Sequence, residues 1–231
     1  MDEKPSEVSE HEETLAFKIV KTIGDFGING SHMLSSAKQV ANEYRNSKSY
    51  ANIDECVDGL INWQSSYAFG AGFVTGLGGV ITLPVTIPSG LIAAWVIQAR
   101  LAGAIAELYG HDSTEDRVRI FATLCLLGDG ASQALKSVGV NAARKGAMAA
   151  LERLPGSILI QINKAVGFRL LTKAGEKGVV NVVKLIPFVG GAVGGAVDWT
   201  STQTVGRIAK DLFRTAPTII TPPPDESSPI Y

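Results

Sequence analysis

Ionisable side chains are missing from a long stretch of this chain: residues 59–99 contain no Asp, Glu, Lys, Arg or His. Over the whole chain 19% of residues are charged, below the roughly 25% of an ordinary globular domain, whereas 45% are hydrophobic. The formal net charge is −1, so overall charge points to no particular partner. A chain this apolar needs either a tightly packed helical interior or contact with lipid.

Cysteine and histidine are also scarce, which excludes two common ways of stabilising a fold. Cys56 and Cys125 are the two cysteines, and neither a CxxC pair nor a nearby histidine accompanies them. A disulfide framework and a zinc site are therefore not expected, and both thiols are predicted to be small buried side chains. Because His11, His32 and His111 are each isolated, we predict no metal ligand and no cofactor.

Motifs of catalysis are absent as well. Residues 76–79 (GLGG) lack the Lys-Ser/Thr that follows in a nucleotide-binding loop, and no GxSxG nucleophile elbow occurs. Asp129, Ser132 and His111 are better explained as turn and cap residues than as a hydrolase site. We therefore predict no catalytic residue, and enzymatic activity stays unassigned.

The two ends of the chain differ from its centre. Residues 1–14 are acidic and polar, and residues 215–231 contain five prolines. We therefore predict a disordered N-terminus and a flexible Pro-rich tail around one helical domain at 15–214. The N-terminus has neither the basic nor the apolar region of a secretory signal, so we expect a cytoplasmic location.

The spacing of apolar residues indicates helices throughout, and no alternation typical of strands is found. We predict an all-α fold, a compact multi-helix bundle around two Gly-rich apolar helical hairpins. The expected helices cover 15–27, 33–45, 54–63, 90–109, 117–127, several segments between 131 and 178, and 199–213. We predict Ser31 and Asp54 as N-caps, Gly110 as a C-cap and Pro155-Gly156 as a break between helices.

Two glycine-rich runs without charge supply the predicted hairpins. The first is 59–99, which Pro84 and Pro88 interrupt, and the second is 185–197, which is too short to span a bilayer. Glycines in these runs recur at a spacing of four, which lets helix backbones approach closely. The predicted packing glycines are Gly72, Gly76, Gly190 and Gly194.

Polar side chains close to these runs form the candidate site. They are Arg100, Glu107, Tyr109, Asp112, Asp198 and Arg207. Because an unpaired buried charge is expensive, we expect Arg100 or Arg207 to pair with Asp198 and hold the two runs together. The alternative is that these residues only mark helix ends at the surface.

Basic residues concentrate between Arg117 and Lys184, where eleven Lys and Arg stand against three acidic residues. Such a region suits an anionic surface such as lipid headgroups, or is a solvated helical face. Nucleic acid is not expected as a partner, because the region has no interleaved aromatic residues and no recognised motif.

Several blocks of the sequence resemble the EcsC family. They are GLGG at 76–79, LPVTIP at 83–88, the long apolar helix with Arg100, IAELYGHD at 105–112 and IPFVGGAVGGAVDWTSTQTVGRIAKDLF at 186–213. The family takes its name from a bacterial operon that also encodes an ABC transporter. The resemblance therefore implies a bacterial protein linked to membrane transport or secretion, and it implies no reaction.

Two functions remain open on these residues. In the first, the protein is membrane-associated: the apolar runs insert shallowly into the cytoplasmic leaflet and residues 117–184 face the headgroups, with a membrane protein such as an ABC transporter as partner. In the second, the protein is soluble in the cytoplasm and the runs form a core with a pocket for a lipid-like ligand. Hydrolase activity belongs to this alternative.

Overall fold

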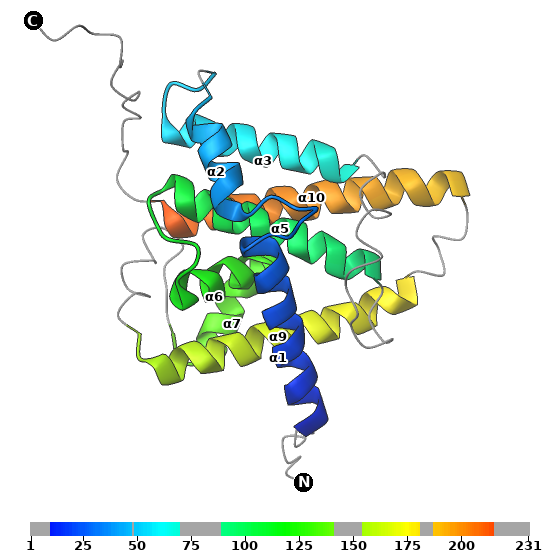
Figure 1. Ribbon diagram of the computed structural model, residues 1–231. Helices are drawn as coiled ribbons and strands as arrows, with labels where there is room; N and C mark the ends of the chain where they lie inside the picture. Colours follow the sequence, from blue (N-terminus) through cyan, green and yellow to red (C-terminus); the bar gives the residue numbers. More distant parts are fainter. Residues whose placement is uncertain (1–9, 48, 70–88, 141–153, 181–186, 215–231) are drawn as a thin grey trace, which may run out of the picture.

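Helices make up the regular structure of this protein. The computed structural model describes residues 10–47, 49–69, 89–140, 154–180 and 187–214, and no strand occurs among them. The elements are α1 (Glu10–Ile28), α2 (Ala37–Arg45), α3 (Ile53–Phe69), α5 (Ser89–Leu108), α6 (Asp116–Cys125), the 3₁₀ turn η1 (Gly128–Gly130), α7 (Ala131–Ser137), α9 (Gly156–Val180) and α10 (Pro187–Phe213), shown in Figure 1. The prediction of an all-α bundle is confirmed.

Helix α5 lies at the centre and contacts α1, α2, α3, α6 and α10. Every residue from Trp95 to Tyr109 is buried. Among the described residues, Leu91–Leu108 is the one helical stretch long and apolar enough to cross a membrane, with a mean hydropathy of 1.5. Since 89% of this stretch is buried inside the protein, α5 is packed as a core helix.

Helices α3 and α10 pack against each other in opposite directions, and both contact α5. Near the start of α3, Asp58 pairs with Lys210 at the end of α10, whereas Asn62, one turn later, accepts from Gln203. Helix α5 runs parallel to α10. Gln98 Nε2 donates to Ser201 Oγ over 3.1 Å and to Thr202 Oγ1 over 3.4 Å, and His111 after the end of α5 contacts Phe213.

These three helices share one end that carries no charge. Residues 59–69 of α3, 89–99 of α5 and 187–197 of α10 contain no Asp, Glu, Lys, Arg or His. Because α3 runs against the other two, the three segments lie at the same end, on the right of Figure 1. We call it the uncharged end. Residues 70–88, with Gly72 and Gly76, lie outside the described residues.

Two helices begin earlier than the sequence indicated. Helix α1 starts at Glu10, so residues 10–14 are helical rather than disordered; acidic residues favour a helix N-terminus, where the helix dipole is positive. Helix α10 starts at Pro187, so the second glycine-rich run, with Gly190 and Gly194, is the first half of one helix and not a hairpin. Proline suits this first position because its missing N–H would be unpaired there anyway.

The caps of α2 and α3 differ from the predicted ones. Ser36, not Ser31, caps α2, because its hydroxyl accepts from the N–H of Gln39, whose side chain accepts in return from the N–H of Ser36. Asn52, not Asp54, caps α3 by accepting from a backbone N–H of the first turn at 2.9 Å. The carboxylate of Asp54 is therefore available to other helices.

Two predicted helix limits are confirmed. Gly110 has a φ of +90° and ends α5, where the N–H of His111 donates to the carbonyl of Ala106 over 3.0 Å. Helix α9 begins at Gly156, directly after Pro155.

Close helix crossings use glycines that the sequence pattern did not single out. These are Gly27 between α1 and α5, Gly103 between α5 and α2, Gly167 between α9 and α1, and Gly206 between α10 and α3. A Cβ on any of them would come within 3.0 Å of the facing helix. The crossings therefore depend on the absence of a side chain at these four positions.

Candidate functional site

Five residues at the end opposite the uncharged end link α3, α5 and α10, and we call them the polar latch: Asp54, Asp58, Tyr109, Lys210 and Arg214. The Oδ1 of Asp54 accepts from the hydroxyl of Tyr109 at 2.6 Å, and its Oδ2 pairs with Arg214. Lys210 Nζ lies 2.5 Å from Asp58 Oδ1 and donates to the carbonyl of Asp54 over 3.4 Å. The latch therefore joins the start of α3 to the ends of α5 and α10.

Burial and hydrogen bonding keep the Tyr109 hydroxyl protonated. Burial raises its pKa, and the hydrogen bond to Asp54 and the charge of that carboxylate raise the pKa further. Close to the latch, His111 Nε2 lies 3.0 Å from the carbonyl oxygen of Phe213, and the two rings are 5.6 Å apart. Tyr109 and His111 thus serve to fix helix ends.

A layer of buried polar side chains crosses the same helices farther along. Arg100 on α5 is only 8% exposed, and its Nη2 donates to Gln64 Oε1 over a long 3.4 Å. Its Nε has no hydrogen-bond partner. Burial lowers the pKa of Arg100, while Tyr67 and Glu43 act in the opposite direction. Gln98, two residues earlier, is buried in the same layer.

Two further predicted site residues shape the turn after α5. The buried Glu107 accepts from the N–H of Ser113 at 2.8 Å through Oε1, and its carbonyl accepts from Arg45. The exposed Asp112 accepts from the N–H and the hydroxyl of Thr114 at 2.9 and 2.6 Å, and these bonds lower its pKa. Both carboxylates therefore have local structural roles.

The last two predicted residues, Asp198 and Arg207, lie on one helix, about 14 Å apart along its axis. Arg207 donates to Gln203 O and Thr204 Oγ1 of its own helix, and Arg100 donates to Gln64. The six predicted residues therefore occupy separate places: the polar layer, the latch, the α5–α6 turn and α10.

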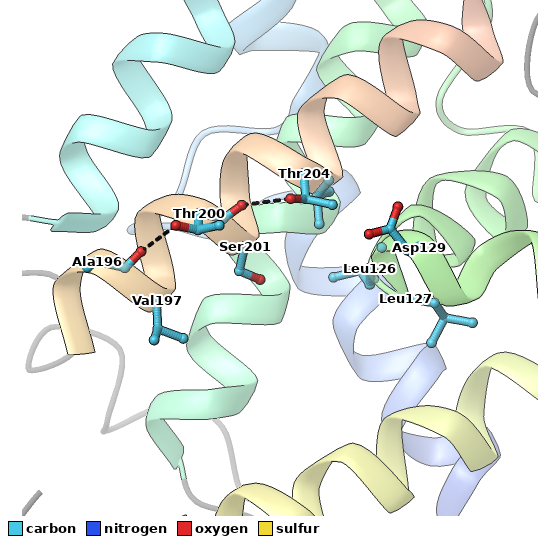
Figure 2. Close-up of a pocket in the computed structure, with 10 residues that line it drawn as sticks. Leu126, Leu127, Asp129, Ala196, Val197, Thr200, Ser201 and Thr204 are labelled. Atoms are coloured by element: carbon cyan, nitrogen blue, oxygen red, sulfur yellow. Dashed lines mark hydrogen bonds between the residues drawn. The ribbon is translucent and has the colours of Figure 1, made fainter. Parts of the chain in front are cut away.

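An open groove of about 550 Å³ lies between α10 and the turn that follows α6 (Figure 2). Its lining is apolar apart from Asp129 and the hydroxyls of Thr200, Ser201 and Thr204. Thr200 donates to the carbonyl of Ala196 at 2.8 Å, Thr204 donates to that of Thr200 at 2.9 Å, and Ser201 accepts from a buried glutamine of α5. With these hydroxyls engaged, the groove presents mainly carbon atoms.

Large aromatic side chains are exposed around the uncharged end. Trp63 and Tyr67 on α3 are 63% and 46% exposed, and Val197 and Trp199 on α10 are 47% and 43% exposed. We call these four residues the aromatic patch. Trp199 and Ser66 border a second groove of about 500 Å³ between the two helices. None of these residues was among the predicted site residues, although three aromatics in or next to charge-free segments are a signal of an exposed apolar surface.

The thiols and two of the basic residues have structural environments. Cys56 and Cys125 are buried, as predicted, and burial raises the pKa of Cys56 to about 11. Arg119 pairs with Asp25 at 2.6 Å, and Arg117 donates to a backbone carbonyl before α9. In the part of the chain that the structure describes, no group of three His, Cys, Asp or Glu side chains could hold a metal ion.

Comparison with known proteins now decides the family. The model of the EcsC protein family matches residues 6–215. The chain belongs to the EcsC family. It is also 28% identical over 123 residues to the uncharacterised protein YdbA of Bacillus subtilis (strain 168), a match that covers 47% of this chain and 44% of YdbA. The chain thus matches less than half the length of this relative, and no solved structure matches it.

Proposed function

We propose that this EcsC family protein docks on a membrane surface through its uncharged end, with the aromatic patch at the level of the lipid headgroups. The exposure of Trp63, Tyr67 and Trp199 in or next to the charge-free segments of α3 and α10 carries the proposal. Tryptophan and tyrosine suit the boundary between water and hydrocarbon, because their rings are apolar and their N–H or O–H groups stay hydrated.

Docking of this kind requires no spanning helix. Helix α5 is covered by its neighbours, so its apolar residues stay in the protein core while the ends of α3, α5 and α10 contact lipid. Burying the exposed part of one tryptophan contributes about 1–2 kcal/mol, or roughly a tenfold change in partition for each residue.

Vesicle sedimentation tests the proposal. We expect the wild-type protein to bind vesicles of phosphatidylethanolamine and phosphatidylglycerol, and the double variant Trp63→Ser/Trp199→Ser to bind roughly 100-fold more weakly. Phe17→Ser and Ile160→Ser are matched controls, because these side chains are 57% and 61% exposed on α1 and α9. They should bind like the wild type.

Quenching by brominated lipids gives an independent readout. Trp63 and Trp199 should be quenched on vesicle binding, whereas Trp95, which is 2% exposed, should not. Equal losses of vesicle binding in the double tryptophan variant and in both control variants would show nonspecific adhesion and overturn the proposal. Binding to native membranes but not to pure lipid would also overturn it and would point to a membrane protein, such as a transporter, as the partner.

The groove beside α10 supports a second candidate function, the binding of a single acyl chain. Its hydroxyl groups are already engaged within the protein, so an aliphatic chain fits this lining better than a ligand that needs hydrogen bonds. Val197 and Ala196 place one end of the groove at the uncharged end. Acyl-chain binding in this groove corresponds to the second sequence-based alternative, a pocket for a lipid-like ligand.

Filling the groove tests this candidate. We expect Thr200→Phe to weaken binding of a fluorescent C16 fatty acid at least tenfold, because the ring occupies the space for the chain. Thr172→Phe is the control, since Thr172 is exposed on α9 and its hydroxyl also donates to a backbone carbonyl of its own helix. Equal affinity of the Thr200→Phe variant and the wild type would exclude the groove as the site.

A further inference from the structure

Arg100 is the most deeply buried arginine among the described residues, yet it makes no hydrogen bond to a carboxylate or to a backbone carbonyl. Arg119 and Arg214 pair with carboxylates, and Arg45 and Arg117 donate to backbone carbonyls. Arg100 is nevertheless more deeply buried, and it holds one long bond to a neutral amide while its Nε has no partner. Glu43 acts on this guanidinium through its charge but makes no hydrogen bond to it. A buried cation without a directly bonded carboxylate is suited to bind a further anion.

Arg100 lies at the level of the aromatic patch. It is the first ionisable residue of α5 after the uncharged segment, and its partner Gln64 stands directly after Trp63 in α3. On α10, Ser201 contacts Gln98 and stands two residues after Trp199. If the patch sits among lipid headgroups, Arg100 sits among them too, which is where phosphate groups lie.

One edge of the guanidinium is buried without a full set of hydrogen bonds, and its geometry matches that of a phosphate. Nε and Nη2 form the edge with which arginine binds two oxygens at once, and here Nε is unoccupied while Nη2 holds only the weak bond to Gln64. A phosphate oxygen replaces that bond with a charge-assisted one. The long side chain can reach toward the headgroups while its stem stays packed in the core.

We propose that Arg100, next to the uncharged end, is a phosphate-binding residue, which gives the membrane contact a preference for phospholipid over phosphate-free lipid. The inference rests on the proposed docking of this end. The phosphate can also come from free solution, and the experiment separates the two sources.

The test compares vesicles with and without phosphate. The wild type should bind phosphatidylglycerol vesicles about tenfold more tightly than vesicles of digalactosyldiacylglycerol, a neutral lipid without phosphate. Arg100→Met should abolish this difference and leave binding to the galactolipid unchanged. Arg207→Met, which removes an exposed arginine of α10, should retain the difference.

Thermal unfolding separates this role from a structural one. Because Arg100→Met removes a poorly compensated buried charge and keeps the bulk of the stem, its melting temperature without lipid should equal or exceed that of the wild type. Arg100→Lys, which keeps the charge but not the two-oxygen edge, should restore only part of the preference. A lower melting temperature for Arg100→Met, or an unchanged lipid preference, overturns the proposal.

Adding inorganic phosphate distinguishes free phosphate from lipid phosphate as the ligand. It also shows whether the docking proposal or the Arg100 proposal has failed. If phosphate alone raises the melting temperature of the wild type but not of Arg100→Met, and no vesicle binds, the site takes free phosphate and the membrane proposal is wrong. If both vesicles bind equally and the tryptophan variant loses both, docking stands and Arg100 has no part in it. If neither vesicles nor phosphate bind, both proposals fail.

Discussion

Gly27→Ala should lower the free energy of unfolding by about 2 kcal/mol. The new Cβ would lie 2.7 Å from the carbonyl oxygen of Val96 and 2.9 Å from the Cβ of Ala99, both on α5. Relief requires α1 to move away from the central helix, because one of these contacts is with backbone. The midpoint of urea unfolding should fall while its slope stays constant.

Gly24→Ala is the control on the same helix. The Cβ at this position would meet Arg119 Nη2 at 3.4 Å, the far end of a flexible side chain. Alanine also favours a helix over glycine by up to about 1 kcal/mol, so this variant should be as stable as the wild type or more stable. A similar loss for Gly24→Ala and Gly27→Ala would show that close approach to α5 is not the cause.

The contrast between Gly24 and Gly27 shows why the sequence alone does not predict which glycines lie at close helix crossings. The surroundings of Gly190 and Gly194, where a spacing of four predicted close packing, lie outside what the structure describes, so that prediction stays open. The close crossings that it does describe are made by Gly27, Gly103, Gly167 and Gly206. Each crossing between two helices needs only one position without a side chain. A single glycine carries no pattern, so the sequence could not separate Gly27 from Gly24.

Apolar spacing and capping residues predicted the helix limits well where only one residue could serve as the cap. Apolar spacing located α5 within one residue at each end, and Gly110 gave its C-cap. The start of α2 was harder, because Ser31 and Ser36 are both acceptable caps and only Ser36 has Gln39 at the position that completes the capping box. The start of α10 was misplaced because the four glycines in its first half, which have low helix propensity, suggested a break, whereas the helix begins at Pro187.

The candidate site was harder to predict than the fold, because it depends on which helix ends meet. Asp54 and Arg214 are far apart in the sequence, and the antiparallel pairing of α3 with α10 brings them together. The same pairing puts Trp63 and Trp199 at one end of the molecule. By contrast, burial of Arg100 followed from its place in an apolar helix, although its partner Gln64 did not.

Removing the central carboxylate of the polar latch should be the most costly polar substitution. We expect Asp54→Ala to lower the free energy of unfolding by about 3 kcal/mol, because it leaves the buried Tyr109 hydroxyl and the Arg214 guanidinium without their shared acceptor. Tyr109→Phe should cost about 1 kcal/mol, since Asp54 keeps Arg214. The Asp54→Ala/Tyr109→Phe double variant should lose about 1 kcal/mol less free energy of unfolding than the sum of the two single losses.

Alkaline pH should reveal the same hydrogen bond. The pKa of Tyr109 is raised in the folded protein, first by burial and then by Asp54, so the folded state keeps a proton that the unfolded state loses above about pH 10. The stability from this group is present below that pH and falls as the pH rises beyond it. Tyr109→Phe should therefore lose less stability between neutral and alkaline pH than the wild type.

Asp112→Ala provides the control for the latch. This carboxylate is exposed and accepts only from Thr114 in the hydrogen bonds that the structure describes, so its loss should change stability by less than about 0.5 kcal/mol. A cost for Asp54→Ala no larger than this would show that the helix ends are held by apolar packing alone. In that case the loss of folding stability at alkaline pH should persist in the Tyr109→Phe variant. Its source would then be Tyr44, because burial raises the pKa of Tyr44 to about 12.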